Sequence, residues 1–126
     1  MKALNFLIIG LLMSLLATSA VADDGHVLRH VVSFKYKETA SEADIKKVTD
    51  AFVELKTKIP TIQKLEWGVN NSKEGHNKGC THAFILTFKS EKDRDDYIVH
   101  PAHKAFGGVV GPVLADVFVI DFWAHE

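Results

Sequence analysis

Hydrophobic and polar residues alternate along the chain with two different periods, and the changes of period predict where strands and helices lie. From 27 to 36 every second residue is large and mostly apolar, which is typical of a strand with one buried face. From 45 to 59 apolar residues recur at spacings of three and four, which predicts an amphipathic helix. Pro60 ends this helix because proline cannot donate the next backbone hydrogen bond.

The second half of the chain contains three more strand-like segments and two short helices. Ser90 is a helix N-cap with acidic residues behind it, and Pro101 separates the two short helices. The last segment is almost continuously apolar. The expected elements are a strand at 27–36, a helix starting between 39 and 44 and ending at 59, strands at 62–69 and 80–88, helices at 90–97 and 102–109, and a strand at 113–123.

The order strand, helix, strand, strand, helix, strand predicts an α+β fold of the ferredoxin-like kind (β-α-β-β-α-β), with helices on one face of one sheet. The last strand is apolar on both faces between 117 and 123, so the second face is also expected to be covered. A second copy of the chain is the expected cover. Two sheets packed face to face then close into a dimeric α/β barrel, with Trp67 and Trp123 expected in the dimer core.

The first 22 residues have the three parts of a cleavable export signal. Lys2 supplies the positive charge, 4–16 is apolar, and Ala20 to Ala22 supply the small residues that precede cleavage. The apolar run is shorter than the roughly 20 residues that span a bilayer, and a retained N-terminal anchor is the alternative interpretation. Cleavage after Ala22 leaves one domain at 23–126, exported to the periplasm or secreted.

Charge and cysteine content exclude several classes of function. Lys plus Arg number 15 and Asp plus Glu number 16, which gives a net charge of −1. Such a chain lacks the basic field that holds nucleic acid or anionic lipid, so neither nucleic acid binding nor stable membrane insertion after signal cleavage is expected. Cys80 is the only cysteine, so the domain has no intramolecular disulfide. No cofactor is expected.

Histidines on apolar strand faces are the first candidates for chemistry. His30 and His82 share faces with apolar residues on two strands that neighbour each other in a ferredoxin-like sheet, so they are expected to lie close together beneath the helices. Burying an imidazole without a partner costs about 1–3 kcal/mol. These rings are therefore expected to bond to each other, to Tyr97, to water or to a ligand. Pro101 is expected to direct His103 toward the same end of the sheet.

Five short strings of residues carry a resemblance to a known family. They are 30–35 in the first strand, Trp67-Gly68, Thr81-His82, the string from Tyr97 to His103, and 119–122. Over residues 28 to 123 the chain resembles the stress-responsive dimeric α/β-barrel (Dabb) family. The resemblance implies a ferredoxin-like protomer and a homodimer. In one member, a plant polyketide cyclase, a Tyr and a His act together in an intramolecular aldol condensation, and the match implies these roles for Tyr97 and His103.

Two functions follow for these residues. The first is an exported, stress-associated homodimer that binds a small apolar or aromatic ligand in a pocket lined by His30, His82, Phe84 and Phe106. The second is a cyclase or lyase in which His103 is the general base and Tyr97 the general acid. A monooxygenase without metal or haem is a related possibility that rests on fold analogy alone.

Two other interpretations use the same residues. His30, His82, His100 and His103 can together hold a transition metal in an envelope protein, although their spacing fits no standard ligand motif and no residue is assigned to a metal. Alternatively, the histidines and Tyr97 hold the helix corner together by hydrogen bonds. The sequence leaves these alternatives open.

Overall fold

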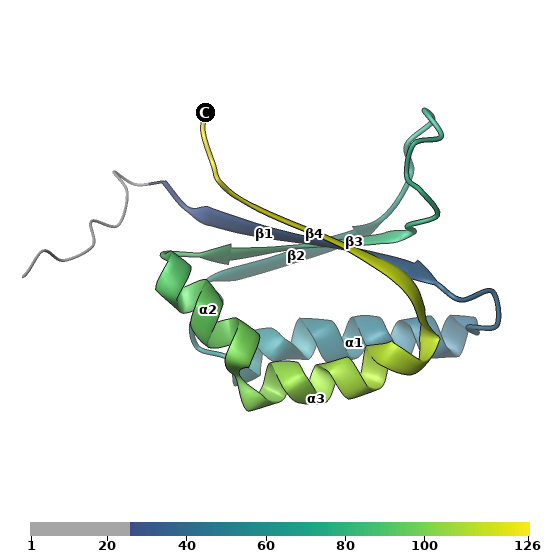
Figure 1. Ribbon diagram of the computed structural model, residues 1–126, viewed down its shortest axis with the longest axis horizontal. Helices are drawn as coiled ribbons and strands as arrows, with labels where there is room; N and C mark the ends of the chain where they lie inside the picture. The colour runs from purple at the N-terminus through teal and green to yellow at the C-terminus, as the bar shows by residue number, and fades with distance from the viewer. Residues whose placement is uncertain (1–25) are drawn as a thin grey trace, which may run out of the picture.

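A computed structural model of the chain describes residues 26–126, and the predicted export signal at 1–22 lies outside the described residues. This part of the chain contains four strands and three α-helices, and their arrangement can be followed in Figure 1. In the described part, no helix has the length and apolar character that crossing a membrane takes. The elements are β1 (Leu28–Tyr36), α1 (Glu42–Lys58), β2 (Lys64–Val69), β3 (His82–Phe88), α2 (Glu91–Val99), α3 (Pro101–Val110), a 3-10 turn (Gly111–Val113) and β4 (Leu114–Trp123).

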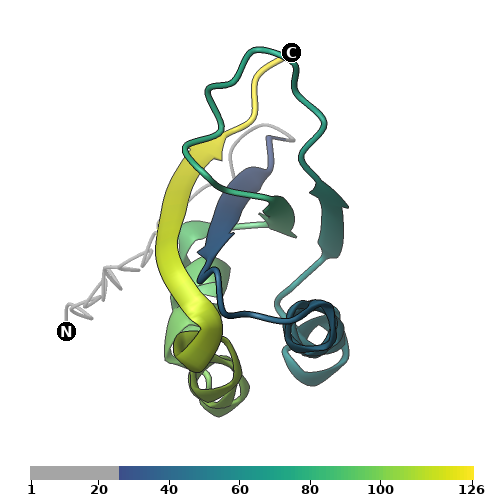
Figure 2. The same cartoon turned by 90° about the vertical axis from the view of Figure 1, so that its right-hand side faces the viewer.

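The four strands form one antiparallel sheet in the order β2-β3-β1-β4. All three helices lie on the same side of this sheet, as Figures 1 and 2 show from two directions. This arrangement is the ferredoxin-like α+β fold, so the fold predicted from the order of elements is confirmed. The loop between β2 and β3 and the end of β4 rise on the opposite side, away from the helices.

Side-chain caps fix where the helices begin. At the start of α1, the Ser41 N–H donates to Asp44 Oδ2 at 3.0 Å and the Asp44 N–H donates to Ser41 Oγ at 3.1 Å. Between α2 and α3, His100 has an extended backbone (φ −64°, ψ 137°), as a residue before proline favours. Its Nδ1 accepts a hydrogen bond from the Ala102 N–H at 3.0 Å, so His100 caps α3.

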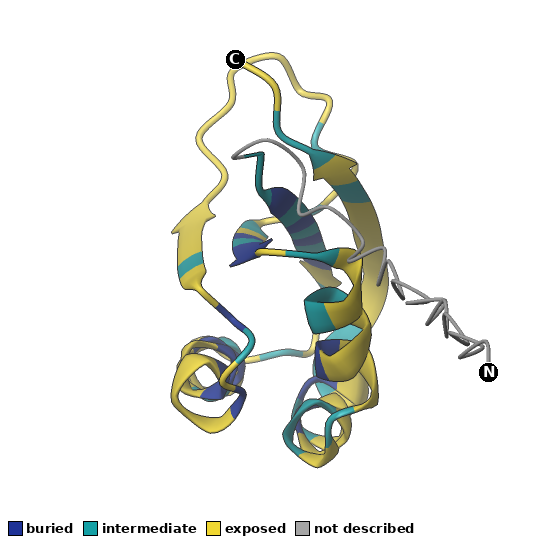
Figure 3. Cartoon of the chain, turned by 90° about the vertical axis from the view of Figure 1, so that its left-hand side faces the viewer, coloured by how far each residue is buried: buried dark blue, intermediate teal, exposed yellow. Residues whose placement is uncertain are grey.

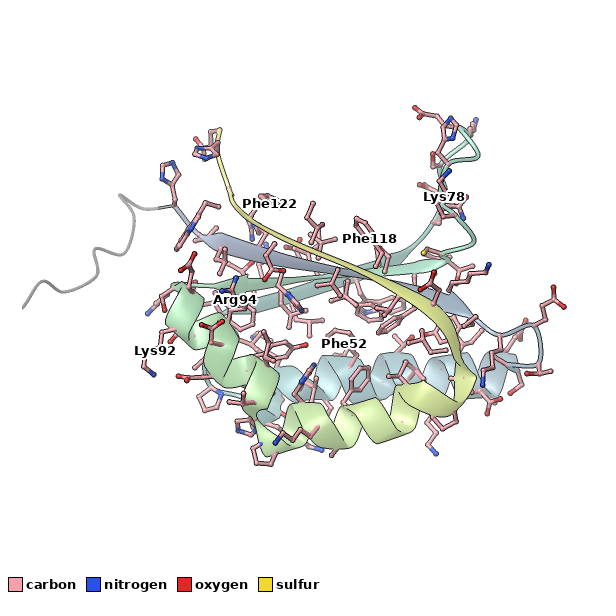
Figure 4. All side chains as sticks on the ribbon, viewed as in Figure 1. Phe52, Lys78, Lys92, Arg94, Phe118 and Phe122 are labelled. Carbon is pink, nitrogen blue, oxygen red and sulfur yellow. The ribbon has the colours of Figure 1, made fainter. Side chains whose placement is uncertain are left out.

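The core lies between the sheet and the helices, where Figure 3 shows the buried residues on their facing sides. Phe52 of α1 is at its centre (Figure 4), with ring centroids 4.2 Å from Phe84 and 4.7 Å from Phe106. The buried hydrophobic residues are Leu28, Val32, Phe34, Val48, Phe52, Leu55, Ile59, Ile62, Phe84, Leu86, Phe88, Tyr97, Phe106 and Val110.

The other face of the sheet carries exposed apolar side chains. Phe118, Ile120 and Phe122 of β4 are 55%, 48% and 47% exposed, and Figure 4 shows the two phenylalanines on the side away from the helices. The tryptophans are not among them. Trp67 pairs with Phe84, and Trp123 pairs with Leu28, and both partners are core residues. Paired residues share a face, so the prediction that Trp67 and Trp123 fill the core of a dimer is wrong.

Candidate functional site

Tyr97 lies between two histidines where the corner of α2 and α3 meets the sheet. Its side chain comes from the last turns of α2 and is 1% exposed. The ring centroid of His30, from β1, is 5.4 Å away, and that of His103, from α3, is 4.5 Å away. The structure therefore brings together three of the residues that the sequence predicted for the site.

The break at Pro101 positions His103. Because α2 ends at Val99 and α3 begins anew at Pro101, the first turn of α3 folds back toward Tyr97. His103 Nδ1 lies 2.9 Å from the carbonyl oxygen of Ile98. A carbonyl oxygen only accepts, so Nδ1 carries the hydrogen, and the neutral ring has its lone pair on Nε2. Nε2 is therefore the nitrogen of His103 that can take up a proton.

A carboxylate from β4 completes the group. His30 Nδ1 lies 2.6 Å from Asp121 Oδ1, and Arg94 Nη1 of α2 donates to Asp121 Oδ2 at 3.1 Å. Figure 4 shows Arg94 between α2 and the sheet. Asp121 is thus held between a buried imidazole and a guanidinium, and it fixes the hydrogen of His30 on Nδ1.

The sequence interpretation missed both Asp121 and Arg94. A signal for Asp121 was present, because it is the one acid among the odd-numbered residues from 117 to 123, the set that faces the helices. It also pairs directly with His30 in the register of β1 and β4. Arg94 gave no comparable signal, since it is one charged residue in a strongly charged helix.

Burial shifts the pKa values of Tyr97 and His103 in opposite directions. Desolvation lowers the pKa of His103, and the neighbouring His30 adds to this effect, while the bond to Ile98 partly opposes it. Desolvation raises the pKa of Tyr97, and the charge of Asp121 raises it further. At neutral pH, His103 is therefore a neutral base and Tyr97 a protonated phenol. This is the arrangement that acid–base chemistry requires.

His82 is not part of this group. The register pairs His82 with Phe34 and His30 with Leu86, so the two histidines lie four residues apart along neighbouring strands, roughly 13 Å at 3.3 Å per residue. The prediction that His30 and His82 lie close together is wrong, because sequence parity fixes the face of a strand and not its register. His82 instead contacts the rings of Tyr36 at 5.4 Å and Trp67 at 6.3 Å.

Phe84 and Phe106 pack on Phe52 in the centre of the core, and their ligand-binding role stays a prediction. The structure gives no support to the interpretation that the histidines of the predicted site bind a metal ion. Among residues 26–126, no three His, Cys, Asp or Glu side chains are grouped so that they hold a metal ion. His100 uses its Nδ1 to cap α3.

The lowered pKa values of His82 and His103 predict how the stability of the protein depends on pH. Desolvation holds the pKa values of His82 and His103 below 6.5 in the folded protein, so between those values and 6.5 the unfolded chain binds more protons. The free energy of unfolding is expected to be highest above pH 6.5. It is expected to fall as the pH drops from 6.5 through the lower pKa values that His82 and His103 have in the folded protein. Urea unfolding between about pH 7.5 and pH 5 measures this. Replacing both histidines by Gln is expected to flatten the curve, and a stability that increases on acidification contradicts the assignment.

The described domain is therefore a ferredoxin-like protomer with a buried Tyr–His pair at its helix corner, supported by a His–Asp–Arg chain. A family model described as the stress responsive A/B barrel domain matches residues 28–124. The chain belongs to this family, as its sequence motifs predicted.

Three known proteins place the chain among its relatives. Olivetolic acid cyclase of Cannabis sativa is 30% identical over 95 residues, which cover 75% of this chain and 94% of the cyclase. Hydroxynitrile lyase of Passiflora edulis has the same fold, with a TM-score of 0.74 at 24% identity over 79% of this chain and 94% of the lyase. A dimeric ferredoxin-like protein of unknown function from Thermobifida fusca gives 0.69 at 24% identity over 80% of this chain and 93% of that one.

Proposed function

We propose that this chain is an acid–base enzyme of the cyclase or lyase kind, which makes or breaks a carbon–carbon bond beside a carbonyl group. The single observation that carries the proposal is the contact of Tyr97 and His103, with ring centroids 4.5 Å apart and pKa values displaced in opposite directions. The names of two relatives, a cyclase and a hydroxynitrile lyase, support the same class of reaction.

His103 Nε2 is the base of the proposed reaction. In the direction of bond formation, it removes a proton from the carbon next to a carbonyl group, and the resulting enolate oxygen accepts a hydrogen bond from the Tyr97 hydroxyl. The enolate carbon then attacks a second carbonyl and forms the new carbon–carbon bond. The alkoxide that results takes the proton back from His103. In the reverse direction, the same groups cleave the bond.

His30, Asp121 and Arg94 are positioning residues in this proposal. The Arg94 guanidinium and the His30 N–H hold the two oxygens of Asp121 at 3.1 and 2.6 Å. His30 in turn packs on the ring of Tyr97. Removing the carboxylate frees the His30 ring, and with it one wall against which the Tyr97 phenol is oriented.

Turnover of two substrate classes tests the proposal. The full chain is incubated with an aromatic hydroxynitrile, mandelonitrile, and benzaldehyde release is followed by absorbance. A linear polyketide thioester is tested in parallel, and ring formation is followed by liquid chromatography. We expect turnover of one of them above the uncatalysed rate. If neither is turned over, or if turnover survives removal of His103, the proposal is wrong.

A non-catalytic ligand-binding dimer is the second candidate. The observation that favours it is the burial of Tyr97, which at 1% exposure packs tightly between Phe88, His30 and His103. In this case the cluster holds the helix corner in place, and Tyr97→Phe leaves every measured activity unchanged. The variant series in the Discussion distinguishes the two.

We also propose that the protein is a homodimer formed through the face of the sheet that carries Phe118, Ile120 and Phe122. A single domain of this size gains much stability from covering such a patch, and structural neighbours are described as dimeric.

Ile120→Asp is expected to convert the dimer to a monomer, because it places an unpaired charge in an apolar interface. Sedimentation equilibrium measures the change. Val119→Asp is the matched control, since Val119 is its neighbour on β4, is 51% exposed and points to the other side of the sheet. If Val119→Asp is a monomer and Ile120→Asp remains a dimer, the interface does not lie on the face of the sheet that carries Ile120.

Export and a role in stress complete the proposal. The apolar segment at 4–16 followed by Ala20 to Ala22 supports cleavage after Ala22, and the family description supports the stress association. N-terminal sequencing of the protein recovered from the periplasm or medium tests the first part. An N-terminus that retains Lys2 there contradicts it.

A further inference from the structure

The hydrogen bonding between β1 and β4 continues past the ends of these two strands. The Ala124 N–H donates to the Val27 carbonyl at 2.9 Å, directly beyond the pair formed by Leu28 and Trp123. Figure 1 shows the start of β1 and the end of β4 at the same end of the sheet. One step further along this register, residue 26 lies opposite residue 125, and both are histidines.

The position of these two histidines in the ladder favours contact between their side chains. Val27 and Ala124 are joined by a backbone hydrogen bond, so the next pair is a non-hydrogen-bonded pair, in which the side chains of antiparallel strands come closest. The ring centroids of His26 and His125 are 5.1 Å apart, and the ring planes are inclined by 60°. His26 is partly buried and His125 is exposed, so solvent reaches the pair.

The pair is separate from the proposed reaction site and from the proposed dimer face. His26 precedes His30 by four residues, roughly 13 Å along a strand at about 3.3 Å per residue. Alternation of side chains along β4 places His125 on the same side as Trp123, opposite to the side of Phe122. A second copy packed on Phe122 and its apolar neighbours therefore does not cover the side on which the two rings lie.

Two imidazoles at this spacing can share one metal ion. Zinc binds an imidazole nitrogen at about 2.0–2.1 Å with tetrahedral geometry, so two rings on one ion have centroids roughly 5 Å apart. The separation of 5.1 Å between His26 and His125 matches this value, so the two strands need not move to accept an ion. Imidazole nitrogen is a ligand that zinc, copper and nickel prefer, whereas magnesium and calcium prefer oxygen.

The two rings supply only part of a coordination sphere. Residues 26–126 contain no group of three His, Cys, Asp or Glu side chains that fits a metal ion, so the remaining positions around an ion on this pair fall to water. Such a site is open, unlike the closed four-ligand sites that hold structural zinc. It is expected to exchange its ion with the solution and to stabilise the folded chain only while the ion is bound.

We propose that His26 and His125 bind one divalent transition-metal ion of the class that prefers imidazole, with Zn²⁺ as the probe, and that the ion fastens the end of β4 to the start of β1. The site goes beyond the proposed reaction and does not depend on it.

Calorimetric titration with Zn²⁺ tests the proposal. The full chain is purified without a histidine tag and titrated near neutral pH with Zn²⁺, and in a parallel run with Mg²⁺. We expect one Zn²⁺ ion to bind per chain, and no binding of Mg²⁺ at the same concentrations, because Mg²⁺ prefers oxygen ligands.

Three variants locate the ion. His26→Gln and His125→Gln each remove one ring nitrogen, and each is expected to weaken Zn²⁺ binding by about tenfold or more, because a single imidazole then remains. His76→Gln is the matched control. His76 is an exposed histidine of the loop between β2 and β3, at the other end of the sheet, and its loss is expected to leave the affinity unchanged.

Hydrogen exchange distinguishes an ion that joins the two strands from an ion on a single surface histidine. Zn²⁺ held by both rings is expected to slow exchange of the Ala124 amide, since this N–H belongs to the hydrogen bond next to the pair. The slowing is expected to disappear in His26→Gln and in His125→Gln.

Equal weakening of Zn²⁺ binding by His26→Gln and His76→Gln overturns the proposal, and so does a loss of affinity in only one of the two pair variants. An exchange rate of Ala124 that Zn²⁺ leaves unchanged also overturns it, because the ion then does not join the strands. The readouts are binding and exchange rather than turnover, so failure of the proposed reaction leaves this test intact.

Discussion

His103→Gln is expected to lower turnover of the carbonyl substrate by about 10²- to 10⁴-fold, the usual contribution of a positioned general base. Glutamine keeps an N–H group that can donate to the Ile98 carbonyl, so the corner of α2 and α3 is expected to remain folded. It has no lone pair of comparable basicity to replace Nε2. Initial rates at saturating substrate measure the loss directly.

Two further variants distinguish a catalytic role of Tyr97 and His103 from a purely structural one. Tyr97→Phe keeps the ring that packs on His30 and His103 but removes the hydroxyl, and a loss of about 10²-fold or more is expected if the hydroxyl stabilises an enolate. His76→Gln removes an exposed histidine from the loop between β2 and β3 and is expected to leave the rate unchanged. Normal rates for both site variants identify the cluster as structural and favour the non-catalytic dimer.

The pH dependence of the rate is a further signature of the base. Burial keeps the pKa of His103 below 6.5, so the acidic limb of the kcat/KM profile is expected to lie below this value. A merely structural histidine does not impose such a limb on the rate.

Phe52→Ala is expected to reduce the free energy of unfolding by about 3–5 kcal/mol. Phe52 is buried at the centre of the core, stacked on Phe84 and in contact with Phe34 and Phe106. The substitution leaves a cavity that these rings fill only partly. Since domains of this size are stable by about 5–15 kcal/mol, the loss removes a large share of the total. Urea unfolding at fixed protein concentration measures it.

Val53→Ala is the control for this substitution. Val53 is the next residue of α1 and is exposed, so its truncation is expected to change stability by less than about 0.5 kcal/mol. Similar losses for the two variants mean that the helix packs on the sheet through a different face.

The period of the hydrophobic pattern was enough to predict the order of the elements and the side of the sheet that the helices cover. The β1 face with Leu28 and Phe34 and the α1 face with Phe52 are both buried as expected, because burial of one face is what produces the pattern. The caps at Ser41 and Ser90 also act locally, within three residues, and so can be recognised without tertiary information.

The site was predicted only in part. Tyr97 and His103 are six residues apart around one proline, so their contact follows from local geometry. The position of His82 relative to His30 was predicted wrongly. Alternation along the sequence tells which face of a strand a residue lies on, whereas the register between strands depends on how the whole strands pair. Asp121 lies 91 residues from His30, and its role depends on that pairing.

The sequence by itself determined the class of fold, the approximate positions of the helices and the Tyr97–His103 corner, because these depend on periodicity and on neighbours along the chain. The tertiary structure alone decided that His30 joins Asp121 rather than His82, and that His26 lies opposite His125 where β1 begins and β4 ends. The physical reason is the same in both cases. Hydrogen bonding between strands sets which distant residues are opposite each other, and a one-residue change in register alters every such pair.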